Sequence, residues 1–241
     1  MKLDDIKKLQ QKKYRAEFGH FLVEGEHLVL ELQKAALDNP QLQRSELYVT
    51  AAYEHWQSPF KTYLISDRQM AQIAETKTPQ GIVAVVPMPA GAAPVAGPCE
   101  RAIYLHEIQD PGNLGTILRT LAWFGNFRCL LSPGSVDPYN PKVVRSSMGA
   151  IFHAPMELDV ELDSLRARFE RIACLDMNGD RLQSASFKGF DCYLFGNEAR
   201  GVPREQLAAL NAQPFTIAGC GAIESLNLAA TVNICAYELN R

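Results

Sequence analysis

Two glycines and a proline precede a run of helical spacing in DPGNLGTILRT, residues 110–120, and an apolar strand-like run, AIYLHEI, comes just before them. A strand, a glycine-rich turn and a helix start form the phosphate cradle of many proteins. The stretch lacks the lysine and hydroxyl of a Walker loop, and Gly112 and Gly115 give only G-x-x-G, not the dinucleotide fingerprint. The residues by themselves favour a turn and a helix, with Asn113 as the cap side chain and Arg119 as a surface arginine.

Charged and amide side chains follow a second apolar run, CYLF, in the stretch FGNEARGVP, residues 195–203. Gly196 permits a close approach by backbone or ligand, and Glu198 and Arg200 stand at the carboxyl end of a predicted strand. Pro203 suits the first turn of a following helix. The pattern fits either a ligand site or a turn with an exposed ion pair.

A third stretch, IESLNLAATVNICAYEL at residues 223–239, begins with polar residues and then becomes almost wholly apolar. Ser225 is predicted to cap a helix by accepting a hydrogen bond from the amide of Asn227 or Leu228. The apolar run predicts a buried helix, in which Asn227 and Asn233 need partners. A capped core helix accounts for Ser225 well and for Asn227 less well.

Other reactive residue types give no further candidate. His106 lies on a predicted core strand and is interpreted as structural. The other four histidines lack metal-ligand spacing, so no metal site is expected: His20, His27, His55 and His153. No G-x-S-x-G elbow exists, which disfavours a serine hydrolase. The six cysteines show no close pairing, so we expect reduced, buried thiols in a cytoplasmic protein.

The composition is that of an ordinary globular protein, with 241 residues, 47% apolar and 21% charged residues, and a net charge of −3. This charge argues against a protein that coats nucleic acid but permits an enzyme with a local basic site. No run reaches the roughly 20 apolar residues of a membrane helix, and the charged N-terminus lacks an apolar signal core. No membrane association is therefore expected.

The segment PMPAGAAPVAGP, residues 87–98, has four prolines, two glycines and no charge, which predicts a linker. Before it, strand-like and helix-like runs alternate, including one helix-like stretch over residues 3–13, and predict a small α/β sandwich. After it, short apolar strands between helices predict a mostly parallel sheet covered on both faces. Ligands bind such sheets beyond the carboxyl ends of strands, and three such ends stand out, after RIACL, CYLF and PFTI.

Taken together and in this order, NLGTILRTLAWFG, FGNEARGVP and IESLNLAATVNICAYEL resemble the three motifs of SpoU-type RNA ribose 2′-O-methyltransferases of the SPOUT superfamily. KVVRSSMGAIF is similar to the family's segment between motifs one and two, and FLVEGEHLVLEL and TPQGIVAVV resemble its N-terminal substrate-binding domain. The resemblance covers nearly the whole chain. It implies an L30e-like RNA-binding α/β domain at residues 1–86, the linker at 87–98, and a SPOUT α/β methyltransferase domain with a deep trefoil knot at 99–241.

The resemblance also implies partners. S-adenosyl-L-methionine is the expected cofactor, a second copy of the chain completes a homodimer, and the substrate is structured RNA, ribosomal more than transfer RNA. Two rival interpretations stay open: a non-catalytic RNA-binding or assembly factor on the same fold, and a nucleotide-dependent enzyme of another doubly wound fold.

The resemblance assigns residues to each of these partners. Chemistry falls to five residues, namely Arg119, Asn113, Glu198, Ser225 and Asn227. The cofactor is expected among backbone groups at Leu175, Gly196, Asn197, Ile217 and Leu226. The first 15 residues hold six basic and two acidic residues, either a solvated face or an RNA contact made by Lys7, Lys8, Lys12, Lys13 and Arg15.

Arg119 is implied to be the key catalytic residue and to act on the cofactor bound by the partner subunit. The pKa of an arginine guanidinium is above about 12, so the side chain stays protonated. We therefore expect Arg119 to act as a fixed cation. It would grip the adjacent phosphate and lower the pKa of the ribose hydroxyl, with the proton passing to water or to a carboxylate such as Glu198.

Two departures from the family pattern touch the cofactor loops. Ala218, Gly219 and Cys220 stand after the last predicted strand, where the family often has a Pro-Met pair, and Ala199 stands where motif two often has glycine. Both could alter the shape of these loops, but neither removes a side chain assigned to chemistry.

Overall fold

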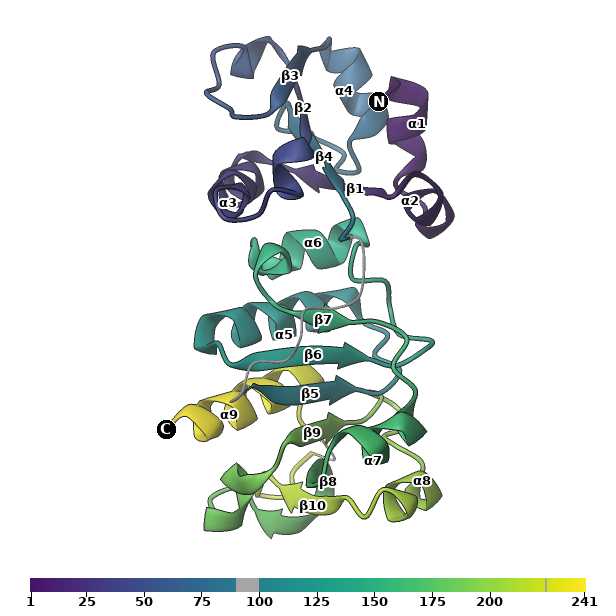
Figure 1. Ribbon diagram of the computed structural model, residues 1–241, viewed down its shortest axis with the longest axis vertical. Helices are drawn as coiled ribbons and strands as arrows, with labels where there is room; N and C mark the ends of the chain where they lie inside the picture. The colour runs from purple at the N-terminus through teal and green to yellow at the C-terminus, as the bar shows by residue number, and fades with distance from the viewer. Residues whose placement is uncertain (90–99, 224) are drawn as a thin grey trace. The chain divides into compact units, whose positions relative to one another are not determined.

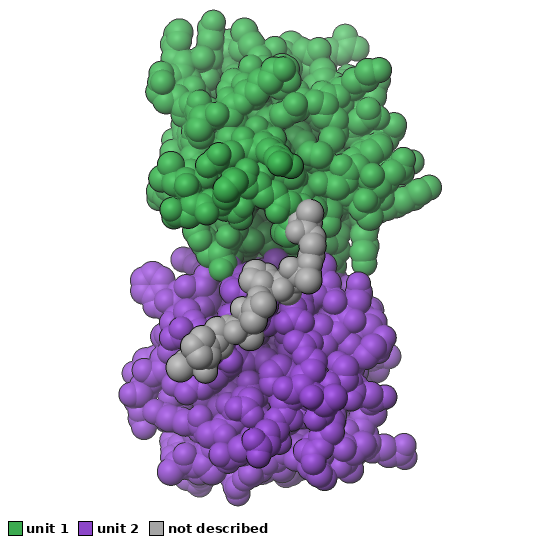
Figure 2. All heavy atoms as spheres, viewed as in Figure 1, with its two compact units in different colours: residues 1–92, 137–153 green, residues 93–136, 154–241 purple. Residues whose placement is uncertain are grey.

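The computed structural model describes residues 1–89, 100–223 and 225–241, and it divides into two compact units (Figure 1). Unit 1 comprises residues 1–92 and 137–153, and unit 2 comprises residues 93–136 and 154–241, coloured green and purple in Figure 2. Most of the predicted linker, from residue 90 to 98, lies outside the described residues. Residues 137–153 belong to the stretch that the sequence assigns to the methyltransferase domain, yet they pack with unit 1.

Unit 1 is built on a four-stranded mixed sheet in the order β1-β4-β2-β3. Strands β1 and β2 run antiparallel to β4, and β3 runs parallel to β2. The strands are β1 (His20–Glu24), β2 (Glu46–Val49), β3 (Lys61–Leu64) and β4 (Ile82–Pro87). The helices are α1 (Leu3–Lys8), α2 (Lys12–Phe18), α3 (Glu26–Ala36), α4 (Asp67–Ile73) and α6 (Pro141–Ser147), with 3-10 turns η1 (Leu42–Arg44), η2 (Ala51–Tyr53) and η3 (Ala150–Phe152).

The helix-like stretch predicted over residues 3–13 is broken into α1 and α2. Gln11 before α2 has an extended backbone, with φ −103° and ψ 134°. The Arg15 guanidinium turns back and donates hydrogen bonds to the carbonyl oxygens of Leu9 and Gln10 at 2.8 and 2.9 Å. These bonds satisfy carbonyls that the break leaves without helical partners, which a pattern of apolar spacing cannot reveal.

Helix α6 is fixed to unit 1 by the residues that precede and follow it. Asp137 forms an ion pair with the buried Arg15, and the Tyr139 ring packs on Phe21 with 4.9 Å between centroids. At the other end, Gly149 has φ +94°, and an added Cβ would lie 2.7 Å from Cβ of Glu31 on α3. Contacts on both sides therefore make residues 137–153 an integral part of this unit.

Unit 2 contains a six-stranded sheet in the order β10-β8-β9-β5-β6-β7, and every neighbouring pair is parallel, as predicted. The strands are β5 (Arg101–Leu105), β6 (Phe127–Leu131), β7 (Met156–Glu157), β8 (Ile172–Arg181), β9 (Cys192–Phe195) and β10 (Gln213–Thr216). The helices are α5 (Pro111–Phe124), α7 (Leu165–Arg168), α8 (Arg204–Ala209) and α9 (Leu228–Asn240), with 3-10 turns η4 (Leu162–Ser164) and η5 (Ala185–Gly189).

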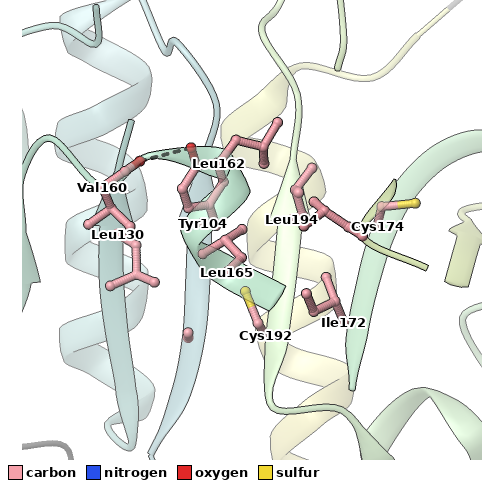
Figure 3. Close-up of a cluster of buried hydrophobic side chains, with 11 residues drawn as sticks. Tyr104, Leu130, Val160, Leu162, Leu165, Ile172, Cys174, Cys192 and Leu194 are labelled. Atoms are coloured by element: carbon pink, nitrogen blue, oxygen red, sulfur yellow. Dashed lines mark hydrogen bonds between the residues drawn. The ribbon is translucent and has the colours of Figure 1, made fainter. Parts of the chain in front are cut away.

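Both faces of this sheet are buried. On one face, Tyr104, Cys192 and Leu194 join Leu162 and Leu165 in a closely packed cluster, where the Tyr104 hydroxyl donates to the Val160 carbonyl at 3.0 Å (Figure 3). Strand residues alternate between faces, so the neighbouring buried side chains of β5 and β9 point to the other face, where α5 and α9 lie side by side (Figure 1). In the described part of the chain, no helix is long and apolar enough to span a membrane.

Candidate active site

The three sequence motifs meet at the side chain of Asn113. Its Nδ2 donates to Glu198 Oε1 at 3.2 Å, and its Oδ1 accepts from Asn227 Nδ2 at 3.0 Å. Asn113 lies in the first turn of α5, Glu198 follows β9, and Asn227 caps α9. One amide therefore joins residues that are 85 and 114 positions away in the sequence.

The Glu198 carboxylate is also held by the backbone before α5. The amides of Gln109 and Asp110 donate to its two oxygens, each at 3.3 Å. Asp110 is the cap of α5, because its side chain accepts from the amide of Asn113 at 2.7 Å and Pro111 fills the first helical position. The prediction that Asn113 is the cap was wrong: the carboxylate three residues earlier takes the amide and leaves the Asn113 side chain available to the other motifs.

The loop after β9 is a closed turn built on Asn197, which is only 7% exposed. Its backbone exchanges two hydrogen bonds with Gly201, at 3.0 and 2.9 Å, and its Oδ1 accepts from the amides of Ala199 and Arg200. A Cβ on Gly196 would lie 2.6 Å from the backbone of Gly201, so this close approach requires glycine.

Glu107, which the sequence analysis did not select, fixes this turn from the end of β5. Its carbonyl accepts from Asn197 Nδ2 at 2.7 Å, and its carboxylate pairs with Arg200 Nη2 at 2.6 Å. The predicted exposed ion pair in this turn is therefore made with Glu107. Glu107 has a positive φ of 47°, held by a 2.6 Å bond from its amide to Ser132 Oγ.

In motif three the helix cap is Asn227 rather than Ser225. Asn227 Oδ1 accepts from the amide of Ala230 at 3.2 Å, and α9 begins at Leu228. Ser225 lies two residues before this cap, is exposed and belongs to no helix or strand. The prediction that Ser225 caps the helix was therefore wrong. The expected burial of α9 also holds for one face only, since Ile234 and Tyr237 are 41% and 58% exposed.

Asn233 on α9 has the partner that its burial requires. Thr120 on α5 donates its hydroxyl hydrogen to Asn233 Oδ1, so the paired helices also share a polar contact.

Arg119 is exposed on α5, six residues after Asn113. Its guanidinium makes no ion pair or hydrogen bond with any other described residue. One helical turn further along the same side, the Trp123 side chain is 83% exposed. Within a single chain, the structure thus joins the amides and carboxylate of the three motifs and leaves the arginine directed to solvent.

Two of the predicted cofactor residues directly follow strands of this sheet, and a third lies where the pairing of β8 with β9 stops, after Cys174. Because β8 itself runs on to Arg181, the strand end predicted after RIACL was wrong. Leu175 is in β8, Gly196 follows β9, and Ile217 follows β10. Leu226 directly precedes the α9 cap. Since parallel neighbours end at one edge of a sheet, these positions share the edge where α/β proteins bind ligands.

The loop from residue 217 to 226 has the groups that an adenosyl cofactor needs. Among its described residues, no backbone N–H or C=O makes a hydrogen bond with another described residue. Ile223 and Leu226 are 73% and 46% exposed. Open backbone groups suit the edge of an adenine, and exposed aliphatic side chains suit its faces, so the loop fits S-adenosylmethionine.

The predicted RNA contacts separate into two groups. Four lysines of α1 and α2 are exposed, namely Lys7, Lys8, Lys12 and Lys13. Arg15 is 3% exposed and is fully engaged by Asp137 and two carbonyls. Arg15 is therefore a structural residue of unit 1, and we leave it out of the proposed RNA contacts.

The cysteines do not all have the buried character that was expected. Cys129, Cys174, Cys192 and Cys235 are buried thiols, and burial raises the pKa of Cys129 to about 12 and that of Cys174 to about 11. Cys220 is exposed, because it lies in the open loop after β10, outside both faces of the sheet. Cys99 lies outside the described residues.

His106 directly follows β5 and is partly buried, and its interpretation as a structural residue stays a prediction. Burial is the main cause that lowers its pKa, with Arg200 adding to this and Glu107 opposing it. Its Nδ1 is buried and finds no hydrogen-bond partner among the residues that the structure describes.

Comparison with known proteins extends the resemblance seen in the motifs. The profile of the SpoU rRNA Methylase family matches residues 100–237, and that of the MRM3-like substrate binding domain matches residues 2–84. The 23S rRNA (guanosine(2553)-2′-O)-methyltransferase RlmP of Bacillus subtilis is 32% identical, over 99% of this chain and 95% of its own.

Solved structures agree with the sequence relatives. A TrmH-family protein of Porphyromonas gingivalis has a TM-score of 0.83 at 30% identity, over 98% of this chain and 96% of its own. The AdoMet-bound rRNA methyltransferase of Sinorhizobium meliloti has a TM-score of 0.79 at 26% identity, over 98% and 93%. The three interlocked motifs, the family profile and these relatives together establish that the chain belongs to the SpoU rRNA Methylase family.

Proposed function

We propose that the protein transfers a methyl group from S-adenosylmethionine to a ribose 2′-hydroxyl of ribosomal RNA. The observation that carries the proposal is the meeting of Asn113, Glu198 and Asn227 from three separate motifs, close in the chain to the strand ends that suit the cofactor. The relatives support the substrate: RlmP is named as a 23S rRNA 2′-O-methyltransferase, and the S. meliloti enzyme as an rRNA methyltransferase with AdoMet bound.

In this proposal, backbone groups at Leu175, Gly196, Ile217 and Leu226 hold the cofactor, with Asn197 shaping the turn beside them. When bound, S-adenosylmethionine supplies an electrophilic methyl group on a sulfonium. The closed turn at Asn197 is preorganised by its own hydrogen bonds, whereas the loop after β10 has open groups to offer. Binding would therefore order the second loop more than the first.

The side chains of Asn113 and Glu198 hold the motifs in place, and Arg119 supplies the charge. Glu198 already accepts three hydrogen bonds. Its carboxylate is therefore better placed to orient α5 against the turn than to accept the proton of the ribose hydroxyl. Arg119, exposed and unpaired among the described residues, is free to bind a phosphate and favour the alkoxide form of the neighbouring hydroxyl. Correct orientation of reacting groups supplies about 7–11 kcal/mol in favourable cases.

The test is Arg119→Lys assayed with tritiated S-adenosylmethionine and ribosomal RNA. A lysine keeps the charge but not the planar fork, so we expect kcat to fall at least about 10-fold and the pH–rate profile to change, while cofactor affinity stays constant. Wild-type kcat with an unchanged profile would overturn the fixed-cation role. The wild-type protein could instead transfer no methyl group to any RNA tested and bind no cofactor by calorimetry. That result would favour a non-catalytic RNA-binding factor.

We further propose that the enzyme acts as a homodimer whose subunits meet on the exposed side of α5 and α9. Trp123, Ile234 and Tyr237 are large apolar side chains exposed on these paired helices, and the ring of Phe124 contacts Tyr237 at 6.5 Å. Contiguous exposed apolar residues mark interaction surfaces. Arg119 is one turn from Trp123, so a partner on this side brings the arginine into the partner's site.

The same proposal includes the deep trefoil knot around the cofactor loops and the division into an RNA-binding domain at residues 1–86 and a methyltransferase domain at 99–241. The family profiles, which match 2–84 and 100–237, support the division into these two domains. A ribosomal RNA substrate places the enzyme where ribosomes are assembled, which for bacterial relatives is the cytoplasm.

A further inference from the structure

Two aromatic rings lie stacked one turn apart on α2. Tyr14 and Phe18 have centroids 5.9 Å apart and an interplanar angle of 24°. Both side chains are partly exposed, although Phe18 also packs against the core of unit 1. The ring pair therefore has one side fixed to the protein and aromatic surface left at the edge of the unit.

Lysine ammonium groups lie over these rings. Lys8 Nζ is 5.8 Å from each centroid, and Lys13 Nζ is 5.6 Å from that of Tyr14. Lys8 also pairs with Asp5 at 2.9 Å. Lys7 and Lys12, on the same two helices, are exposed and form no ion pair with a described residue.

Arg15, which lies between Tyr14 and Phe18 in the sequence and is buried, holds the helix that carries the two rings in place. Its guanidinium holds the two carbonyls at the end of α1 and the carboxylate of Asp137, so α2 is fixed at both its start and its inner face. A site that is preorganised loses less conformational entropy when a ligand binds.

We propose that Tyr14 and Phe18 form a stacking platform for an unpaired base of RNA, flanked by phosphate contacts from Lys7, Lys8, Lys12 and Lys13. The proposal rests on RNA being the substrate, as proposed above, and names the element that grips it. Aromatic rings beside basic groups are the combination that proteins use for single-stranded nucleic acid. A base entering the platform displaces the ammonium groups from the ring faces toward phosphates, so the lysines exchange one favourable contact for another.

The experiment measures fluorescence anisotropy of a labelled single-stranded RNA dodecamer and of an abasic dodecamer of the same length, each at several salt concentrations. The full-length protein is compared with Tyr14→Leu, which keeps an apolar side chain but removes the ring, and with Tyr14→Phe, which keeps the ring. The double variant Lys12→Gln/Lys13→Gln removes two charges. Circular dichroism verifies that each variant is folded.

We expect Tyr14→Leu to weaken binding of the normal RNA about 5- to 150-fold, since stacking contributes about 1–3 kcal/mol per base, with an unchanged salt slope. Tyr14→Phe keeps wild-type affinity, and the abasic RNA binds Tyr14→Leu and wild type equally. The double lysine variant lowers the salt slope by about 1.4, at about 0.7 per charge on a single strand.

Wild-type affinity in Tyr14→Leu, or an equal loss for the normal and abasic RNA, would overturn the platform. With ribosomal RNA as substrate, the variant should raise KM and leave kcat unchanged, and a fall in kcat alone would also contradict a binding role. Failure of the proposed activity is distinguishable, because it appears as absent cofactor binding or methyl transfer in wild-type protein while the anisotropy differences persist.

Discussion

Glu107 is held in a backbone conformation that residues other than glycine rarely adopt. Its φ of 47° falls in the left-handed region, where a Cβ costs about 1–2 kcal/mol. Four contacts maintain it: Ser132 Oγ accepts from its amide, Asn197 and Gln109 donate to its carbonyl, and Arg200 pairs with its carboxylate. The carboxylate is the one group here that a glycine would lack, so its pairing with Arg200 accounts for an acidic residue at this position.

The variant Glu107→Gly should change cofactor binding more than it changes the stability of the fold. Glycine relieves the left-handed strain but increases the freedom of the unfolded chain, so the melting temperature should change little. The turn at Asn197 loses its tie to Arg200, and cofactor affinity should fall by at most about 5-fold, since exposed ion pairs contribute about 0–1 kcal/mol. Differential scanning fluorimetry and calorimetry measure the two effects.

The control is Arg200→Ala, alone and combined with Glu107→Gly. Because both substitutions remove the same pair, the double variant should bind the cofactor as weakly as either single variant. Additive losses, or unchanged affinity in both single variants, would show that the pair does not support the cofactor turn.

Residue types and order were enough to select Asn113, Glu198 and Asn227, which the structure brings into one network. The helix caps were predicted less well from local sequence. The Asp-Pro step at the start of α5 is a signal that identifies Asp110 as its cap. The ion pair of Glu107 with Arg200 could not be predicted from the sequence. The two residues stand 93 positions apart, and no helical or strand periodicity links them.

At the scale of elements, the two loops expected to hold the cofactor differ in how much of their backbone is already satisfied. The turn after β9 is closed by reciprocal hydrogen bonds between Asn197 and Gly201. The described residues of the loop after β10 have no such bonds, and that loop contains the exposed Cys220. Cofactor binding should therefore change the accessibility of the second loop.

Alkylation of Cys220 tests this change directly. In a Cys99→Ser background, iodoacetamide should modify Cys220 in the native protein, and saturating S-adenosylmethionine should slow the reaction at least several-fold because the loop closes on the ligand. Peptide mass spectrometry follows each site, with the four buried cysteines as internal references that should react only after unfolding. An equal rate of Cys220 alkylation with and without cofactor would contradict the assignment of this loop.

The periodicity of the sequence predicted the parallel sheet of unit 2, because short apolar runs between helices have few other arrangements. It failed at the join of α1 and α2, where side-chain hydrogen bonds from Arg15 to carbonyls five and six residues earlier replace the helical ones. It also gave no indication that α6 packs with unit 1, since an amphipathic helix pattern shows which face is buried but not against which sheet.

At the scale of the whole molecule, Arg119 makes no hydrogen bond or ion pair with the other described motif residues, while the exposed apolar side chains of Trp123 and Tyr237 lie on the paired helices α5 and α9. In the dimer that we propose, a partner subunit on this surface would supply the arginine to each site. The geometry therefore makes dimerisation a condition for activity in the proposed mechanism, rather than a separate property.

Active-site complementation tests this dependence. Arg119→Ala keeps its cofactor loops, and Gly196→Val keeps Arg119 but blocks the turn at Gly201, so each variant alone should be inactive. Mixed subunits place one intact loop opposite one intact arginine in half of the dimers. After unfolding and refolding together, activity should recover to about a quarter of the wild-type value.

No recovery in the mixture would mean that Arg119 serves the site of its own chain. The control is Trp123→Glu in both variants, which should give monomers by light scattering and abolish complementation. Recovery that persists in those monomers would contradict the proposed surface.

The inclusion of residues 137–153 in unit 1 affects how the nascent chain folds on the ribosome. The partner of Arg15 is Asp137, and the described part of unit 1 is complete only at His153, long after the last strand of its sheet has been made. At about 5–20 residues per second, the 66 residues from Pro87 at the end of β4 to His153 delay completion by about 3–13 s. Until Asp137 is made, the guanidinium of Arg15 lacks its carboxylate, so the N-terminal unit should mature late, after the whole of motif one at residues 113–125 has been synthesised.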